Sequence, residues 1–90
     1  MSTRYRTLAR DYETMTNAGS LQGDRDALDA RRLGITEPDS WPGNLDYVVE
    51  TAAWKAGLCW NELSADSKAR LCTAYLDGYR PTYLDTYYEG

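Results

Sequence analysis

The sequence predicts an all-α fold, a compact bundle of four to five short helices in a single domain covering residues 1–90. Apolar side chains recur at helical spacing in several segments, and no two segments show the strict alternation typical of paired strands. A chain of 90 residues supports one modest core. Aliphatic side chains are few, so the three Trp and eight Tyr are expected to fill part of that core.

Residues 3–16 are expected to form the first helix. Aromatic or apolar side chains recur there at steps of three or four residues, along one side of a helix. They are Tyr5, Leu8, Tyr12 and Met15. Ser2 or Thr3 is placed to cap its start. Residues 16–20, TNAGS, then predict a loop.

A second, short helix is predicted over residues 24–33, because Gly34 follows it and glycine best accepts the left-handed conformation just past a helix end. Asp24 is the candidate cap, and Leu28 and Leu33 are the candidate buried side chains.

Residues 35–44 contain two prolines and a glycine, which indicates a connection with at most one helical turn. Trp41 lies in this connection. Its indole either folds back over the edge of the core or stays exposed as a recognition anchor.

The third predicted helix, residues 45–56, begins after Asn44 and ends at Gly57. Its main apolar stripe contains Leu45, Val48, Val49, Ala52, Ala53 and Ala56. Tyr47 and Trp54 lie on another side, so most of the circumference is apolar. Such a helix is buried centrally or packs its second face on a partner or on a symmetry mate. A candidate dimer face therefore consists of Tyr47, Glu50 and Trp54.

Residues 60–78 show the clearest helix start in the chain, with Ser64 as the cap. Five side chains are expected to face inward: Leu71, Cys72, Tyr75, Leu76 and Tyr79. Gly78 is the expected stop. Pro81 then suits the first position of a last short helix over residues 81–88. This short helix cannot bury all of its rings, so some are expected to face water.

The formal charge is 10 − 14 = −4. Three arginines lie within the first ten residues, so the rest of the chain is more acidic and favours basic partners over nucleic acid. A less favoured alternative is a DNA-binding regulator. It would use Arg4, Arg6, Arg10, Arg31 and Arg32.

Nothing in the sequence indicates catalysis, a metal site or a cofactor. Histidine is absent, which removes the usual general base and the commonest metal ligand. Cys59 and Cys72 are expected to be small buried thiols rather than a disulfide or a redox pair. No phosphate-binding or nucleophile motif is present. Without a signal peptide or an apolar span, the expected compartment is the cytoplasm, with no membrane partner.

The strongest functional pattern combines carboxylates with aromatic rings. Guanidinium groups pair with carboxylates and stack on rings, so such a surface suits an arginine-rich partner. The candidate partner-binding residues are Asp24, Asp26, Asp29, Tyr83, Asp85, Tyr87, Tyr88 and Glu89. The alternative is an ordinary solvated face on a mildly acidic domain.

Part of the chain resembles a known family. The opening Met1-Ser2-Thr3 with Tyr5, the early helix ending in N-A-G, and the segment NELSADSKARL at residues 61–71 are similar to the small helical anti-CRISPR proteins that phages and other mobile elements use against type I CRISPR-Cas complexes. The resemblance covers about a third of the chain.

The resemblance implies inhibition without catalysis, in the host bacterial cell. An acidic protein of this kind occupies a positively charged site on the surveillance complex or its nuclease and blocks target DNA. It assigns no individual residue. The alternative function, from the residues alone, is a small structural or regulatory helical module that acts through homodimerisation or another protein–protein contact, so the chain is expected to be a monomer or a homodimer.

Overall fold

Helices dominate residues 4–36 and 40–89, the part of the chain that the computed structural model describes. The elements are α1 (Ala9–Arg32), α2 (Leu45–Lys55), the short 3-10 helix η1 (Trp60–Glu62) and α3 (Ala65–Glu89). The all-α class is confirmed, although three α-helices in these residues replace the predicted four to five. The molecule is a single elongated globule of 42 × 22 × 20 Å.

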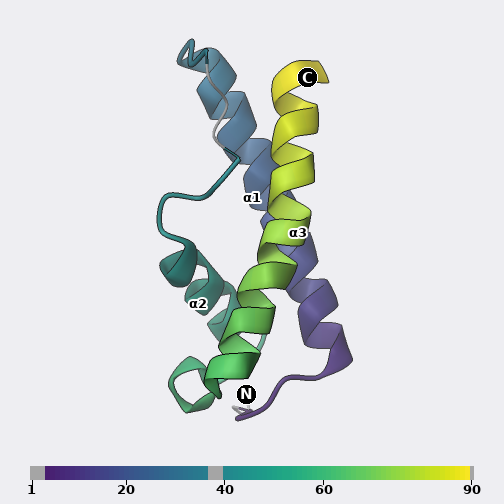
Figure 1. Ribbon diagram of the computed structural model, residues 1–90, viewed down its shortest axis with the longest axis vertical. Helices are drawn as coiled ribbons and strands as arrows, with labels where there is room; N and C mark the ends of the chain where they lie inside the picture. The colour runs from purple at the N-terminus through teal and green to yellow at the C-terminus, as the bar shows by residue number, and fades with distance from the viewer. Residues whose placement is uncertain (1–3, 37–39, 90) are drawn as a thin grey trace.

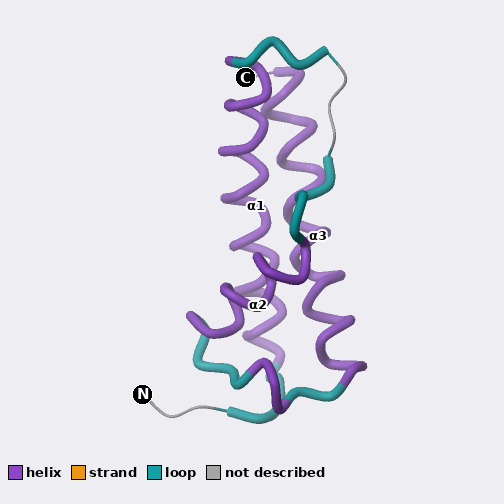
Figure 2. The backbone as a smooth tube through the Cα atoms, turned by 90° about the vertical axis from the view of Figure 1, so that its left-hand side faces the viewer, coloured by secondary structure: helices purple, strands orange, loops and turns teal. Residues whose placement is uncertain are grey.

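The helices α1 and α3 form the frame of the bundle. Figure 1 shows them running in the same direction and crossing near their middles. The shorter α2 runs in the opposite direction beside their lower halves, as the second view also shows (Figure 2). Nothing among the described helices is both long and apolar enough to cross a bilayer.

Glycines allow α1 and α3 to cross with their backbones in contact. A Cβ atom added at Gly19 would lie 2.0 Å from the carbonyl oxygen of Tyr75, and one at Gly78 would lie 1.9 Å from that of Thr16. At Gly23 the added atom would come within 2.5 Å of a backbone oxygen of α3. Real Cβ atoms do not approach other atoms this closely, so the crossing requires glycine at these positions.

The crossing explains why the predicted element boundaries were wrong. Residues 16–20 are not a loop, and residues 24–33 are the second half of α1 rather than a separate helix. Gly78 does not stop α3, and Pro81 lies inside that helix instead of starting a new one over residues 81–88. The sequence pattern assigned these glycines to helix ends, whereas here they permit close packing.

The start of α1 also differs from the prediction. The helix begins at Ala9, and Tyr5 lies before it with 67% of its surface exposed. Arg4 pairs with the segment before η1: its N–H donates to Gly57 O (2.9 Å), and Cys59 N–H donates to its carbonyl (2.7 Å). The candidate caps at residues 2 and 3 lie outside the described residues.

The core lies mainly between α1 and α3 and is built from tyrosine as well as aliphatic side chains. Tyr75, Tyr79 and Tyr83 are buried one helical turn apart, and their rings stack with centroids 6.1 and 5.8 Å apart. The expectation of an aromatic core is therefore confirmed. The prediction that Leu28 and Leu33 are buried was wrong, because they are 50% and 70% exposed. The buried apolar side chains of this half of α1 are Ala27 and Ala30 instead.

Three predicted helix ends are confirmed. Gly34 and Gly57 follow α1 and α2 with φ of 74° and 85°, the left-handed conformation that favours glycine. The hydroxyl of Ser64 accepts a hydrogen bond from the N–H of Ser67 (3.1 Å), as expected for a cap. Val49 and Ala53 of the predicted apolar stripe are fully buried in α2.

Candidate functional site

The two segments predicted to bind a partner lie side by side, because α1 and α3 run in parallel (Figure 1). The hydroxyl of Thr86 donates to the carboxylate of Asp24 (2.6 Å). About two turns earlier in α3, the hydroxyl of Tyr79 donates to the carboxylate of Asp26 (2.5 Å). These bonds join the second half of α1 to the second half of α3.

Four of the eight candidate partner-binding residues therefore make contacts within the protein itself. Asp24 and Asp26 are partly buried and accept hydrogen bonds from α3. Tyr83 is only 4% exposed and lies within the stacked row of rings. Tyr87 stacks on Tyr83, and its hydroxyl donates to a backbone carbonyl after α1, that of residue 35. The prediction that Tyr83 forms part of an open surface does not agree with this burial.

The other four candidates face solvent: Asp29, Asp85, Tyr88 and Glu89. Tyr88 is 69% exposed, and its ring edge meets Tyr87 at 5.1 Å between centroids. Asp29 is less available, because Arg32 donates to its carboxylate (2.8 Å). We call Asp85, Tyr88 and Glu89 the C-terminal acidic patch.

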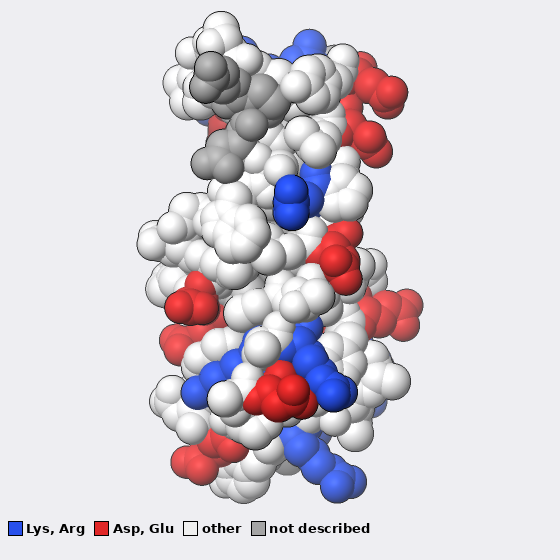
Figure 3. All heavy atoms as spheres, viewed as in Figure 1, with Lys and Arg blue, Asp and Glu red and all other residues white. Residues whose placement is uncertain are grey.

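Acidic side chains occur on several parts of the visible surface. Figure 3 shows carboxylates along the right-hand edge, which includes the upper part of α3, and also at the left-hand edge and in the lower half, where basic side chains lie among them. Arg31 reaches the backbone carbonyl of Thr86 (3.4 Å), so some positive charge lies nearby. The C-terminal acidic patch is therefore one of several groups of exposed carboxylates, since Glu13, Asp46 and Asp77 are exposed elsewhere.

Burial keeps two tyrosines of α3 in their neutral form. Burial, reinforced by Asp26, raises the pKa of Tyr75 to about 12. Burial and the hydrogen bond to Asp26 raise the pKa of Tyr79 still further above its usual value. Both hydroxyls therefore remain protonated at neutral pH, and Tyr79 keeps its role as a hydrogen-bond donor.

The candidate dimer face lies on the outside of α2. Tyr47 is 68% exposed and Trp54 is 45% exposed, whereas Glu50 is half-buried. Trp41 is 50% exposed and lines, together with Tyr47, a surface hollow of about 450 Å³. The indole of Trp41 is therefore only partly folded onto the protein.

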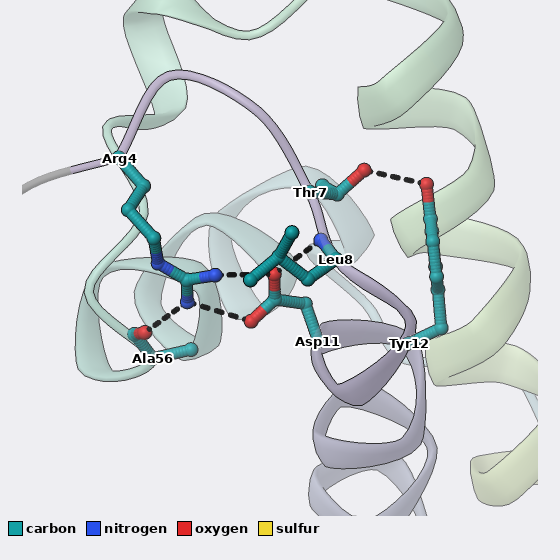
Figure 4. A network of polar contacts seen from close by, with 6 residues as sticks. All are labelled: Arg4, Thr7, Leu8, Asp11, Tyr12 and Ala56. Carbon is teal, nitrogen blue, oxygen red and sulfur yellow. Dashed lines mark hydrogen bonds and ion pairs between the residues drawn. The ribbon is translucent and has the colours of Figure 1, made fainter.

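Arg4 forms the most buried ion pair of the described residues, and sequence reasoning missed it (Figure 4). Its guanidinium donates to both carboxylate oxygens of Asp11 (2.8 and 2.7 Å) and to the carbonyl of Ala56 (2.9 Å). Asp11 is 2% exposed and also accepts the N–H of Leu8 (2.6 Å), so it caps α1 from within the helix. The sequence feature that could have indicated this cap is the acidic residue Asp11 in the first turn of α1.

The Arg4–Asp11 pair changes the pKa of both groups. Burial alone would raise the pKa of Asp11, but the hydrogen bonds from Arg4 and the Leu8 N–H outweigh it and hold that pKa below its usual value. The hydrogen bond to Asp11 raises the pKa of Arg4. Asp11 is therefore ionised at neutral pH despite its burial.

The five arginines of the DNA-binding alternative are not brought together. Arg4 forms an ion pair with Asp11. Arg10 and Arg31 lie near opposite ends of α1, roughly 30 Å apart along the helix axis. Within the described residues no three His, Cys, Asp or Glu side chains are grouped to hold a metal ion. Cys59 and Cys72 are free, half-buried thiols, and burial raises the pKa of Cys72.

Comparison with known proteins adds no assignment. Neither the protein-family models, nor the curated proteins, nor the solved structures give a significant match to this chain.

Proposed function

We propose that this chain is a non-enzymatic inhibitor of a bacterial defence system. It binds a basic, nucleic-acid-handling surface of its target and blocks the engagement of DNA. The resemblance of its sequence to small helical anti-CRISPR proteins makes a type I CRISPR-Cas complex, or its nuclease, the first target to test. This role needs an exposed surface of suitable charge and no catalytic residues.

The C-terminal acidic patch is the observation that carries the proposal. Asp85, Tyr88 and Glu89 are exposed on the last turns of α3. The hydrogen bond from Thr86 to Asp24 holds those turns against α1, so little conformational entropy is lost when the patch binds. A phenol ring between carboxylates offers a guanidinium group both an ion pair and a stacking surface.

Charge reversal tests the proposal. The variant Asp85→Lys with Glu89→Lys should bind an immobilised type I surveillance complex at least about ten-fold more weakly, because attraction is replaced by repulsion. The matched control is Glu13→Lys with Glu62→Lys, which changes the net charge equally at exposed positions near the other end of the bundle. Equal weakening by both variants would remove the role of the patch.

Salt provides an independent readout of the same contact. Affinity of the unchanged protein should fall about ten-fold or more between roughly 0.05 and 0.3 M salt, because exposed charges are screened. Affinity that is indifferent to salt would contradict an electrostatic contact with a basic surface.

A second candidate function is a homodimeric module that uses the outer side of α2. The exposure of Tyr47 and Trp54, at 68% and 45%, favours it, because two large rings on one short helix provide a small apolar contact area. Sedimentation equilibrium of the unchanged chain and of Trp54→Glu tests this candidate. A dimer that Trp54→Glu dissociates would support it, and a strict monomer at high micromolar concentration would eliminate it.

A further inference from the structure

An open groove runs between α1 and α2, away from the C-terminal acidic patch. One part, of about 400 Å³, is lined by both helices and by Tyr75 of α3. A second part, of about 330 Å³, shares Ala18, Leu21, Ala52 and Lys55 with the first. The two parts therefore form one continuous depression along the length of α2.

The lining of the groove is mostly apolar and remains accessible. Ala18, Val48 and Ala52 are half-buried, while Leu21 and Tyr47 are 57% and 68% exposed. The groove persists because α2 packs on α1 much less extensively than α3 does. A contiguous apolar depression between two helices is typical of a surface that binds a helix of another protein.

Two cations flank this apolar strip. Arg25 of α1 and Lys55 of α2 both line the groove and are exposed. Neither side chain makes a hydrogen bond or an ion pair with another described residue. In a chain with a net charge of −4, two unpaired positive charges beside an apolar groove indicate an occupant that carries carboxylates.

The length of the groove limits the occupant further. The 11 residues of α2 extend about 16 Å, which matches a helical segment of about three turns. We infer that the groove receives an amphipathic helix of a partner protein, with apolar side chains at steps of three and four residues facing Leu21, Val48 and Ala52. Carboxylates on the flanks of that helix pair with Arg25 and Lys55. This surface is separate from the acidic patch and of opposite charge, so the inference does not depend on the proposed function.

Peptide binding to the full chain tests the inference. The probe is a synthetic helical peptide of about 14 residues with a leucine stripe and glutamates on its flanks. A matched peptide carries lysine at every glutamate position. In amide NMR spectra of the labelled protein, the glutamate peptide should shift the signals of Ala18, Leu21 and Ala52. It should bind about ten-fold more tightly than the lysine peptide.

A charge swap in the protein makes the test specific. Arg25→Glu with Lys55→Glu should reverse the order of the two peptides. The control variant Arg6→Glu with Arg10→Glu makes the same change in net charge at exposed positions outside the groove and should leave the order unchanged. An unchanged order in the groove variant would overturn the charge argument.

Other outcomes identify other occupants and would also overturn the inference. One is a shift pattern centred on residues 85–89. Another is self-association in sedimentation that buries the groove, which would make a second copy of the chain the occupant. Binding of an aromatic sulfonate dye in the groove, without binding of either peptide, would indicate a small-molecule pocket instead.

Discussion

Replacement of Gly78 by alanine should destabilise this protein strongly, although the same change stabilises most helices. Alanine in a helix interior is favoured over glycine by about 1 kcal/mol. Here the added Cβ atom would lie 1.9 Å from the carbonyl oxygen of Thr16 and 3.0 Å from the N atom of Ser20. Both neighbours are backbone atoms of α1, so no side-chain rotation can relieve the overlap.

The size of the effect follows from how far the helices must separate. Contacts of Cβ atoms below 3.0 Å are essentially never seen, so α1 and α3 must move apart by about 1 Å. A gap of that size forfeits up to about half of the dispersion energy of the atoms across it. Overpacking of a tight core costs about 1–3 kcal/mol or more. The overlap with backbone atoms places the cost at the upper end of this range, so after the gain of about 1 kcal/mol in helix propensity we expect the free energy of unfolding to fall by about 2 kcal/mol.

Urea denaturation followed by circular dichroism at 25 °C measures the change. The loss of stability at the three crossing glycines should follow the size of the overlap. Gly78→Ala and Gly19→Ala should therefore lower the free energy of unfolding more than Gly23→Ala, whose Cβ atom would lie 2.5 Å from its nearest backbone atom. Gly43→Ala is the control, because nothing lies within 4 Å of its added Cβ. Unfolding of Gly78→Ala at the same urea concentration as the unchanged protein, or at a higher one, would contradict the close backbone contact at this position.

Three further changes test other parts of the structure. Asp11→Asn should cost more stability than Asp66→Asn, whose ion pair with Arg70 is exposed. The low folded pKa of Asp11 means that its contribution is complete above about pH 4 and is lost as pH falls, so urea midpoints of Asp11→Asn should depend less on pH there. Because the pKa values of Tyr75 and Tyr79 are raised in the folded protein, their contribution to stability is complete below about pH 10 and is lost above it. Absorbance at about 295 nm should show these two phenols ionising only when the protein unfolds. Ionisation of either phenol before unfolding would contradict its burial. Pro81→Ala should raise the free energy of unfolding by about 1 kcal/mol, because it restores a helical N–H; an unchanged or lower value in urea denaturation would contradict this.

The sequence predicted the helical class and several helix ends, because those features depend on local chemistry. Asn44 before an apolar stripe, the Ser64 cap, and Gly34 and Gly57 after helices are each signalled within a few residues. The outward position of Tyr47 on α2 was likewise visible in the helical period.

The number of helices could not be predicted in the same way, because glycine has two structural uses. Gly34 adopts the left-handed conformation at a helix end, whereas Gly19 and Gly78 bring two backbones together. Both uses depend on the missing Cβ atom, and only the position of the other helix distinguishes them. The sequence alone contains no information of that kind in a local window.

The candidate site was predicted in part. The acidic end of α1 and the tyrosine-rich end of α3 are adjacent, as a shared surface requires. Which side chains remain exposed depends on long-range contacts. Thr86 donates a hydrogen bond to Asp24 and Tyr79 donates one to Asp26, and both pairs join residues that are far apart in the sequence. Tyr88 remained outside because it lies on the side of α3 away from the buried row.

Carboxyl footprinting of the protein alone and bound to a type I surveillance complex tests the proposed role of the acidic patch most directly. Carbodiimide labelling and mass spectrometry report the reactivity of each exposed carboxylate. If the patch forms the contact, Asp85 and Glu89 should lose most of their reactivity in the complex, while Glu13 and Glu62 keep theirs. Full reactivity of Asp85 and Glu89 in a complex that does form would contradict that contact.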